Sequence, residues 1–228
     1  MNNDLSGQII AVTGASSGIG EATALACASA GAAVSLAARR KERIDELAER
    51  IVADGGRAIA VQTDVSDEAQ ANAFVQRTAA ELGRIDVLVN NAGVMLLGPI
   101  NGADTQEWRT MIDANVYGVL YCTHAALPLM LEQGSGHIVN VSSVAGRFAR
   151  AGSGVYNLTK FGIGAFSEAL RQEVAPAGLR VTLIEPGAVA TELPEHNRRE
   201  VIAAIRQMFA DVKPLDADDI ARAILYAI

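Results

Sequence analysis

Short apolar runs alternate with longer amphipathic runs along the chain, and this alternation limits the fold more than any other feature of the sequence. The apolar runs have the length and composition of strands buried on both faces. They cover residues 8–13, 33–37, 58–62, 87–90, 137–141 and 180–185. The amphipathic runs have a helical period, and most of them end at glycine, as helices commonly do. They cover residues 19–30, 41–54, 67–82, 105–133 and 155–175.

Six strands that are each joined to the next through a helix pair in parallel, with right-handed crossovers. The sequence therefore predicts an α/β fold, a doubly wound parallel sheet with helices on both faces. No linker rich in proline, glycine and serine and no internal repeat divides the 228 residues, so we expect a single domain over residues 1–228. Sheets of this kind bind ligands at the carboxyl ends of their strands, where the strand order reverses.

The composition indicates a globular protein with a large core, since 50% of the residues are hydrophobic and 20% are charged. The net charge of −7 disfavours nucleic acid and anionic membranes as partners, because both require a basic face. Cys27 and Cys122 each stand in an apolar helical pattern, and no cysteine or histidine cluster has the spacing of metal ligands. We therefore expect two buried free thiols and no metal.

The sequence also predicts a cytoplasmic protein. Residues 1–7 lack the basic and apolar regions of a signal peptide. The most apolar segment, residues 116–131, is interrupted by His124 and Pro128 and is shorter than a membrane-spanning helix. Two buried thiols also fit a reducing compartment.

A glycine-rich turn follows the first predicted strand and opens a helix. Gly14, Gly18 and Gly20 let the backbone approach a pyrophosphate, and the helix N-terminus offers unpaired N–H groups and a favourable dipole. The alternative is a tight strand-to-helix turn with no ligand, but its place in a strand–helix–strand unit favours dinucleotide binding. The cofactor contacts expected in this turn are Gly14, Ser16, Ser17, Gly18, Ile19 and Gly20.

The end of the second strand predicts which dinucleotide is bound. Folds that prefer NAD usually carry an acidic residue there, bonded to the ribose 2′-hydroxyl. This chain has Ala38, Arg39 and Arg40 instead. Two guanidinium groups and no carboxylate suit a 2′-phosphate, so the predicted cofactor is NADP(H). The alternative is that both arginines only decorate a helix start.

The ends of the third and fourth strands extend the predicted cofactor site. Asp64 and Val65 follow the third strand, where the carboxylate can accept from the adenine amine. Asn91, Ala92 and Gly93 follow the fourth strand and place small and polar residues beside the cofactor. The preceding residue, Asn90, either supports the cofactor or ties neighbouring strands together.

Tyr156, Lys160 and Ser143 form the candidate catalytic group. Tyr156 and Lys160 are four positions apart in a predicted helix and so share one face. We expect the lysine ammonium, reinforced by an oxidised nicotinamide, to lower the pKa of the tyrosine from its usual value near 10. The phenol then exchanges a proton with a carbonyl oxygen. Ser143, at the end of the fifth strand, hydrogen-bonds and polarises that oxygen.

Asn115 lies inside the longest predicted helix, where asparagine is a poor helix former. It either faces solvent or marks a bend in the helix. In the second case its carbonyl turns toward a water that connects Lys160 to bulk solvent and completes a proton path.

Together these elements resemble the short-chain dehydrogenase/reductase family. The matching residues span nearly the whole chain in the family's order: 13–20, Asp64, 90–93, Asn115, Ser143, Tyr156, Lys160, 186–187 and Thr191. The resemblance implies a Rossmann-type fold and a catalytic tetrad of Asn115, Ser143, Tyr156 and Lys160. It also implies that Lys160 binds the nicotinamide ribose, with Tyr156 contacting the cofactor too. The remaining cofactor contacts that it implies are Pro186, Gly187, Val189 and Thr191.

Within the family, residues 184–187 and 191–196 look most similar to NADP-dependent 3-hydroxy-acid or serine dehydrogenases and to the clavulanate-pathway aldehyde reductase. The resemblance leads us to expect a further parallel strand after the helix near residue 216, whereas the sequence ends at Ile228. The two longest predicted helices carry more apolar residues than one face can bury, among them Leu120, Leu127, Phe161 and Phe166. We therefore expect a homodimer or homotetramer.

The expected substrate pocket combines residues 94–96 and 144–146, Phe148 and a lid over about residues 188–212, a loop that orders when ligand binds. Most of these residues are apolar, which favours a small or medium-sized carbonyl compound. His196, Arg198 and Arg199 are either ligands of a substrate carboxylate or solvated charges.

The predicted function is an NADP-dependent oxidoreductase that interconverts a carbonyl and an alcohol by hydride transfer, with Tyr156 as general acid and base. The alternative is a catalytically inactive dinucleotide-sensing protein of the same fold. Such a protein is expected to lack the tyrosine or the lysine, and this chain has both.

Overall fold

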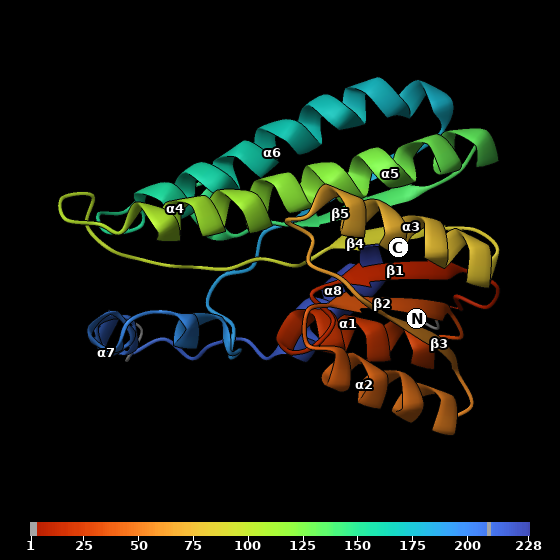
Figure 1. Cartoon of the computed structure of the whole chain (residues 1–228), viewed down its shortest axis with the longest axis horizontal. Coiled ribbons are helices and arrows are strands. Elements are labelled where there is room, and N and C mark those ends of the chain that lie inside the picture. The colour runs from red at the N-terminus through yellow and green to blue at the C-terminus, as the bar shows by residue number, and fades with distance from the viewer. Residues whose placement is uncertain (1–3, 209–210) are drawn as a thin grey trace.

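The computed structural model describes residues 4–208 and 211–228 and contains a six-stranded parallel sheet (Figure 1). Its strand order is β3-β2-β1-β4-β5-β6, with the order reversing between β1 and β4. The strands are β1 Ile9–Thr13, β2 Ala33–Ala38, β3 Arg57–Gln62, β4 Val87–Asn90, β5 His137–Val141 and β6 Arg180–Ile184. The predicted doubly wound parallel sheet is thus confirmed, and each strand lies within one residue of its predicted bounds.

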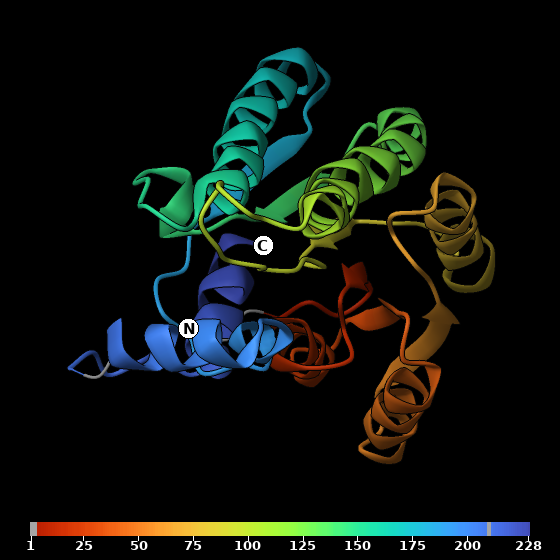
Figure 2. The same cartoon turned by 60° about the vertical axis from the view of Figure 1, so that its left-hand side comes forward.

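Two layers of helices cover the sheet and bury one apolar core on each face (Figures 1 and 2). One layer contains α1 Gly18–Ser29, α2 Lys41–Ala53 and α8 Ala217–Ala227, which is the last element of the 228 residues. The other contains α3 Glu68–Leu82, α5 Gly118–Gln133 and α6 Gly154–Val174. Strand side chains alternate between the cores, so Ile10 and Val12 pack on the first face and Ala11 on the second.

The long helix predicted over residues 105–133 is divided into three parts. It consists of α4 Thr105–Ile112, a π-helical segment Asp113–Tyr117, and α5. The wider π turn inserts an extra residue and re-aims the side chains that follow it. Asn115 stands in this segment, so the helix is irregular at the residue where a bend was predicted.

The region predicted as a flexible lid loop is largely helical in the structure. It contains a short 3₁₀ helix, Leu193–His196, and an amphipathic helix, α7 Arg199–Met208. An isolated parallel bridge pairs Val189 with Leu215 and closes the base of the segment. In Figure 1, α7 lies at the same end of the molecule as α4.

Both cysteines are buried free thiols, as predicted. Burial raises the pKa of Cys27 and of Cys122 to about 12, so neither is a reactive thiolate at neutral pH. Among residues 4–208 and 211–228, no helix is long and apolar enough to span a membrane. The same residues contain no group of three or more histidine, cysteine, aspartate or glutamate side chains placed to hold a metal ion.

Candidate active site

The turn between β1 and α1 has glycine at the positions where it comes closest to neighbouring backbone. Gly14 and Gly18 have positive φ values of 67° and 57°. A Cβ atom on Gly20 would lie 2.3 Å from the carbonyl oxygen of Gly14, and one on Gly14 would lie 2.8 Å from the Cα atom of Ala92. Only glycine therefore fits at these positions. Within the described residues the N-cap of α1, Ser17, makes no side-chain capping bond, so the helix N-terminus is open to an anion.

A cavity of about 1210 Å³ opens along the carboxyl ends of the strands, beside this turn. Its size suits a dinucleotide together with a small substrate, since a pocket for one drug-sized molecule is about 300–1,000 Å³. The predicted site residues that line it are Gly14, Ser16, Ser17, Gly18, Ile19, Arg39, Arg40, Asp64, Val65, Asn91, Ala92, Gly93, Ser143, Tyr156, Lys160, Pro186, Gly187, Val189 and Thr191. Gly20 and Asn115 do not line the cavity, but Gly20 packs against Gly14 and Asn115 bonds to the backbone of Val94, both of which do.

The two arginines after β2 have different surroundings. Arg40 donates to the hydroxyl groups of Ser16 and Ser17, at 2.7–3.1 Å, so it points toward the glycine-rich turn. Arg40 also contacts Glu192 of the predicted lid segment at 2.8 Å. Arg39 is exposed and lines the cavity. Both side chains therefore belong to the cavity wall, which favours the cofactor interpretation over surface decoration.

The residues after β3 and β4 hold the backbone beside the cavity. Asp64 accepts through Oδ1 from the backbone and hydroxyl of Ser66, so part of its carboxylate stabilises the turn. Asn91 donates to the carbonyl oxygen of Thr13 at 2.9 Å, and the Thr13 hydroxyl accepts from the backbone N–H of Asn91 and of Ala92. The ends of β1 and β4 are thereby tied together under the cavity.

Asn90 has a structural role in this protein. Its Nδ2 atom donates to the side chains of Thr123 at 3.1 Å and Asn140 at 2.9 Å, and Asn140 in turn donates to Ser167 at 2.9 Å. All four residues are buried. This polar chain joins α5, β4, β5 and α6, and Asn90 is absent from the cavity wall.

Tyr156, Ser143 and Lys160 meet at one place in the cavity wall. Tyr156 and Lys160 project from the first two turns of α6, and Ser143 follows β5. Tyr156 is 7% exposed and Lys160 is 8% exposed. The lysine Nζ atom lies 5.8 Å from the tyrosine ring centroid and donates to the carbonyl oxygen of Val141 at 3.0 Å. The predicted three-residue group is therefore brought together.

The electrostatics of this group differ from the expectation. Burial raises the pKa of Tyr156, and a hydrogen bond with Ser143 acts in the opposite direction. Burial also lowers the pKa of Lys160 to about 8. The expected lowering of the tyrosine pKa is thus wrong for the chain's own residues, because desolvation of the phenolate outweighs the neighbouring groups.

Asn115 is buried, so the alternative that it faces solvent is wrong. Its side chain pairs with both backbone groups of Val94, accepting from the N–H at 2.7 Å and donating to the carbonyl at 2.8 Å. It also donates to the hydroxyl of Thr159 at 3.2 Å. The π segment thereby anchors the loop after β4 to α6, next to Lys160.

Asn197 holds the other end of that loop, and the sequence analysis did not identify it. Its side chain accepts from the backbone N–H of Leu97 at 2.6 Å and donates to the carbonyl of Met95 at 2.8 Å. Two asparagines thus pin the loop to the π segment and to the lid. Asn197 stands in an irregular segment, and nothing in the neighbouring sequence indicates a partner 100 positions away.

Two of the three residues predicted as ligands of a substrate carboxylate lie outside the cavity wall. Arg198 lies 3.5 Å from the carboxylate of Glu107 on α4 and is absent from the cavity wall, as is Arg199. His196 does line the cavity. Of the three proposed carboxylate ligands, the structure therefore brings only His196 to the site.

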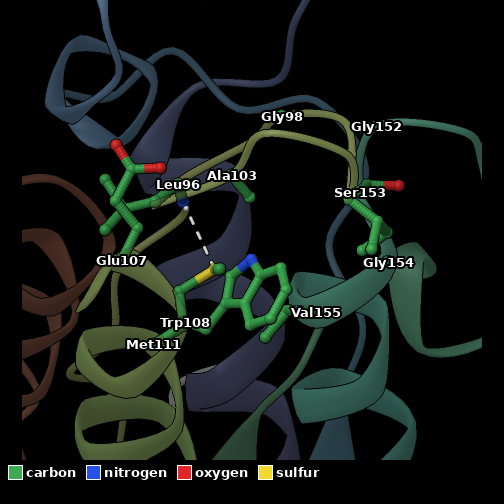
Figure 3. A pocket seen from close by; sticks show the side chains of 11 residues that line it. Leu96, Gly98, Ala103, Glu107, Trp108, Met111, Gly152, Ser153, Gly154 and Val155 are labelled. Atoms are coloured by element: carbon green, nitrogen blue, oxygen red, sulfur yellow. Dashed lines mark hydrogen bonds between the residues drawn. The ribbon is translucent and has the colours of Figure 1, made fainter. Parts of the chain in front are cut away.

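A second, very small cavity of about 10 Å³ lies behind the loop after β4, between the starts of α4 and α6 (Figure 3). Figure 3 shows Trp108 and Met111 directed into this space, and the backbone N–H of Leu96 donates to the Met111 sulfur at 3.4 Å. The volume is about that of one water molecule. Leu96 lines this space and not the large cavity, so its expected place in the substrate pocket is wrong.

Comparison with known families identifies the class of protein that this fold and site define. Residues 8–202 match the family model described as short chain dehydrogenase. The chain therefore belongs to the short-chain dehydrogenase/reductase family and is an NAD(P)-dependent dehydrogenase or reductase.

Particular relatives and structures agree with this assignment. The chain is 41% identical, over 99% of its length and 92% of the relative's, to an uncharacterized oxidoreductase of Staphylococcus saprophyticus. It is also 41% identical, over 98% of its length, to the glycine betaine reductase of Emericella nidulans, but it spans only 18% of that protein.

Among solved structures, serine dehydrogenase complexed with NADP⁺ is similar at 35% identity and a TM-score of 0.89, covering 96% of this chain and 88% of that one. A short-chain dehydrogenase/reductase from Burkholderia phymatum in complex with NAD has 30% identity and a TM-score of 0.91, covering 98% of this chain and 86% of that one. Neighbours of this chain therefore bind either dinucleotide.

Proposed function

We propose that the protein interconverts a carbonyl and an alcohol by hydride transfer, with NADP(H) as cofactor and Tyr156 as the proton donor and acceptor. The observation that carries this proposal is the meeting of Tyr156, Ser143 and Lys160 in the wall of the same cavity that the glycine-rich turn lines. A proton donor and a dinucleotide cradle then face one reaction space. The inactive sensing alternative has no comparable support, since the tyrosine and the lysine are both in place.

The glycine-rich turn fits a dinucleotide. Cβ atoms on Gly14 and Gly20 would fill the space beside the turn, and the N-terminus of α1 offers N–H groups to a pyrophosphate. Pro186, Gly187, Val189 and Thr191 line the wall across the cavity from β2, where a nicotinamide would be held. When bound, the nicotinamide supplies or accepts the hydride.

The chain's own residues handle the substrate oxygen and its proton. The hydroxyl groups of Ser143 and Tyr156 line the same cavity and are close enough to interact, so an oxygen seated beside both would accept from both. The raised pKa of Tyr156 keeps the phenol protonated at neutral pH, which is the form that reduction of a carbonyl requires. Lys160, whose pKa is lowered to about 8, can return a proton to the phenol.

The substrate side of the cavity is mainly apolar. Val94, Met95, Val144, Phe148 and Val201 line it. We propose that residues 188–212 act as a lid over this space, and that the substrate is a small or medium-sized carbonyl compound. The names of two similar proteins, glycine betaine reductase and serine dehydrogenase, add glycine betaine and serine to the compounds to be assayed.

The decisive experiment compares the wild-type protein with Tyr156→Phe on a panel of ketones, aldehydes and hydroxy acids, followed by NADPH absorbance. We expect the variant to lose at least ~10²-fold in rate, because it lacks the proton but keeps the ring. NADPH binding should remain close to that of the wild type. Retention of most activity would remove Tyr156 from the proposed role.

The cofactor preference has its own test. Arg39 and Arg40 support NADPH over NADH, and Ala38→Asp combined with Arg39→Ala should reverse the preference. The new carboxylate would accept from the 2′-hydroxyl and repel the 2′-phosphate. Equal catalytic efficiency of the wild type with both cofactors would contradict the proposal.

We further propose a cytoplasmic homodimer or homotetramer that assembles through α5 and α6. On α6, Phe161 is 44% exposed and Leu158 is 61% exposed, and on α5 Leu131 is 44% exposed, whereas Leu120, Leu127 and Phe166 are partly buried. Large exposed apolar side chains on neighbouring helices are typical of an interface. Sedimentation at micromolar concentration tests this, and a monomer of 23.8 kDa would refute it.

A further inference from the structure

A carboxylate of the predicted lid segment bridges two arginines, Arg40 in the cavity wall and Arg43 outside it. Glu192 Oε2 lies 2.8 Å from Arg40 Nη1, and Glu192 Oε1 lies 2.8 Å from Arg43 Nη1. Each carboxylate oxygen thus accepts a hydrogen bond from one guanidinium. Arg43 and Arg40 are 149 and 152 positions away from Glu192 in the sequence. The hydrogen bonds from Arg43 and Arg40 hold the pKa of Glu192 at about 2, so this anion persists across the pH range of any assay.

The bridge occupies guanidinium groups in the region predicted to hold a 2′-phosphate. Arg40 directs Nη1 to Glu192 and its other two nitrogens to the hydroxyl groups of Ser16 and Ser17. Every nitrogen of Arg40 is therefore engaged. Among the described residues no ion pair involves Arg39, which lines the same wall. Of the three arginines Arg39, Arg40 and Arg43, the last two are therefore already paired with the Glu192 carboxylate.

We propose that Glu192 is a specificity-determining residue that competes with the cofactor 2′-phosphate for Arg40, which lines the cavity. This inference rests on the proposed NADP(H) preference, and it states that Glu192 weakens that preference. A 2′-phosphate and the Glu192 carboxylate carry the same sign of charge and require the same donors, so binding one weakens the hold on the other. A cofactor with a 2′-hydroxyl meets no such competition.

Glu192 thus reduces the preference for the 2′-phosphorylated dinucleotide that Arg39 and Arg40 would otherwise give. The effect on cofactor preference is moderate, because the side chains of Glu192, Arg40 and Arg43 are 41–47% exposed and water screens their charges. The carboxylate also belongs to the lid, next to Thr191, which contacts the glycine-rich turn at Gly18. Displacement of Glu192 by a phosphate would therefore act on the lid as well.

The test measures binding of two cofactor fragments by calorimetry at low ionic strength, without any turnover. Adenosine 2′,5′-bisphosphate carries the 2′-phosphate, and adenosine 5′-monophosphate lacks it. Glu192→Gln should tighten the Kd of the bisphosphate about 3- to 10-fold and change that of the monophosphate by less than about 2-fold. The gain should shrink as salt is added. Retained monophosphate binding shows that the variant is folded.

The matched control is Glu81→Gln on α3. Glu81 is an exposed carboxylate paired with Arg77, so the control makes the same change in net charge away from the cavity. It should leave the Kd of both fragments unchanged. An equal gain in bisphosphate affinity in this control would overturn the inference, because the effect would then be one of overall charge.

Other outcomes separate the inference from the proposed function. A wild type that prefers the bisphosphate, with Glu192→Gln unchanged in that preference, overturns the role of Glu192 and leaves the NADP(H) proposal standing. A wild type without preference, with a variant that gains one, supports the role of Glu192 and contradicts the NADP(H) preference. Equal weakening of both fragments in the variant overturns competition, since Glu192 would then hold the adenosine.

Discussion

His137 begins β5 and lies deep in the protein, with 2% of its surface exposed. Its Nε2 atom shares a hydrogen bond of 2.8 Å with the Thr182 hydroxyl on β6, and among the described residues Nδ1 has no partner. Burial, with the nearby charge of Arg180, lowers the pKa of His137 from 6.5 to about 4. The folded protein therefore holds this imidazole neutral.

Acid should destabilise the protein through this side chain. Because the folded-state pKa lies below the unfolded-state value, the unfolded chain binds more protons between pH 6.5 and pH 4. The contribution of His137 to stability is complete above pH 6.5 and is lost as the pH falls toward 4. The two pKa values give a loss of about 2 kcal/mol at pH 5 and about 3 kcal/mol below pH 4.

Urea unfolding at pH 8 and at pH 5 measures this loss, with His137→Gln as the comparison. The glutamine amide can still hydrogen-bond with Thr182 but does not titrate. Carboxylates titrate equally in both proteins, so the difference between the two pH-dependent losses isolates the imidazole. We expect the variant to lose about 2 kcal/mol less than the wild type between these pH values. Equal losses in the two proteins would refute the reasoning.

Three further substitutions test the geometry of the site. Gly20→Ala should abolish cofactor binding and lower the midpoint of thermal unfolding, because its Cβ would lie 2.3 Å from the Gly14 carbonyl oxygen; calorimetry with NADPH and a melting curve measure both. Asn197→Ala should raise KM for the substrate about 10-fold with cofactor Kd unchanged, because the Met95–Leu97 backbone loses two hydrogen bonds; steady-state kinetics decide, and an unchanged KM would contradict it. Lys160→Met should lower kcat at least ~10²-fold and also weaken NADPH binding, and a variant with normal cofactor affinity would limit the lysine to proton transfer.

The sheet could be predicted closely because its signals are local. Each strand is a short apolar run bounded by polar residues or glycine, and helices between successive strands leave parallel pairing as the only simple topology. The glycine-rich turn, Tyr156 and Lys160 were also found from local spacing. The bend at Asn115 was inferred because asparagine fits poorly in a long helix.

The features that were missed depend on contacts between distant segments. Nothing near Asn197 or Glu192 in the sequence indicates partners that are 100 and 152 positions away. The raised pKa of Tyr156 depends on how completely the fold buries the ring, which spacing alone does not reveal. The lid helix α7 was taken as a loop because its polar residues dominated the interpretation, although its apolar residues have a helical period.

The polar chain from Thr123 through Asn90 and Asn140 to Ser167 has a consequence for engineering. Removing one member would leave a buried polar partner unpaired and lower the free energy of unfolding by about 1–3 kcal/mol. These four positions should therefore be changed together or not at all. The lid is attached by a separate set of hydrogen bonds, and many of its side chains are exposed. A mutant library over residues 193–206 that keeps Asn197, whose side chain holds the Met95–Leu97 backbone, would therefore vary the substrate pocket without changing this buried polar chain.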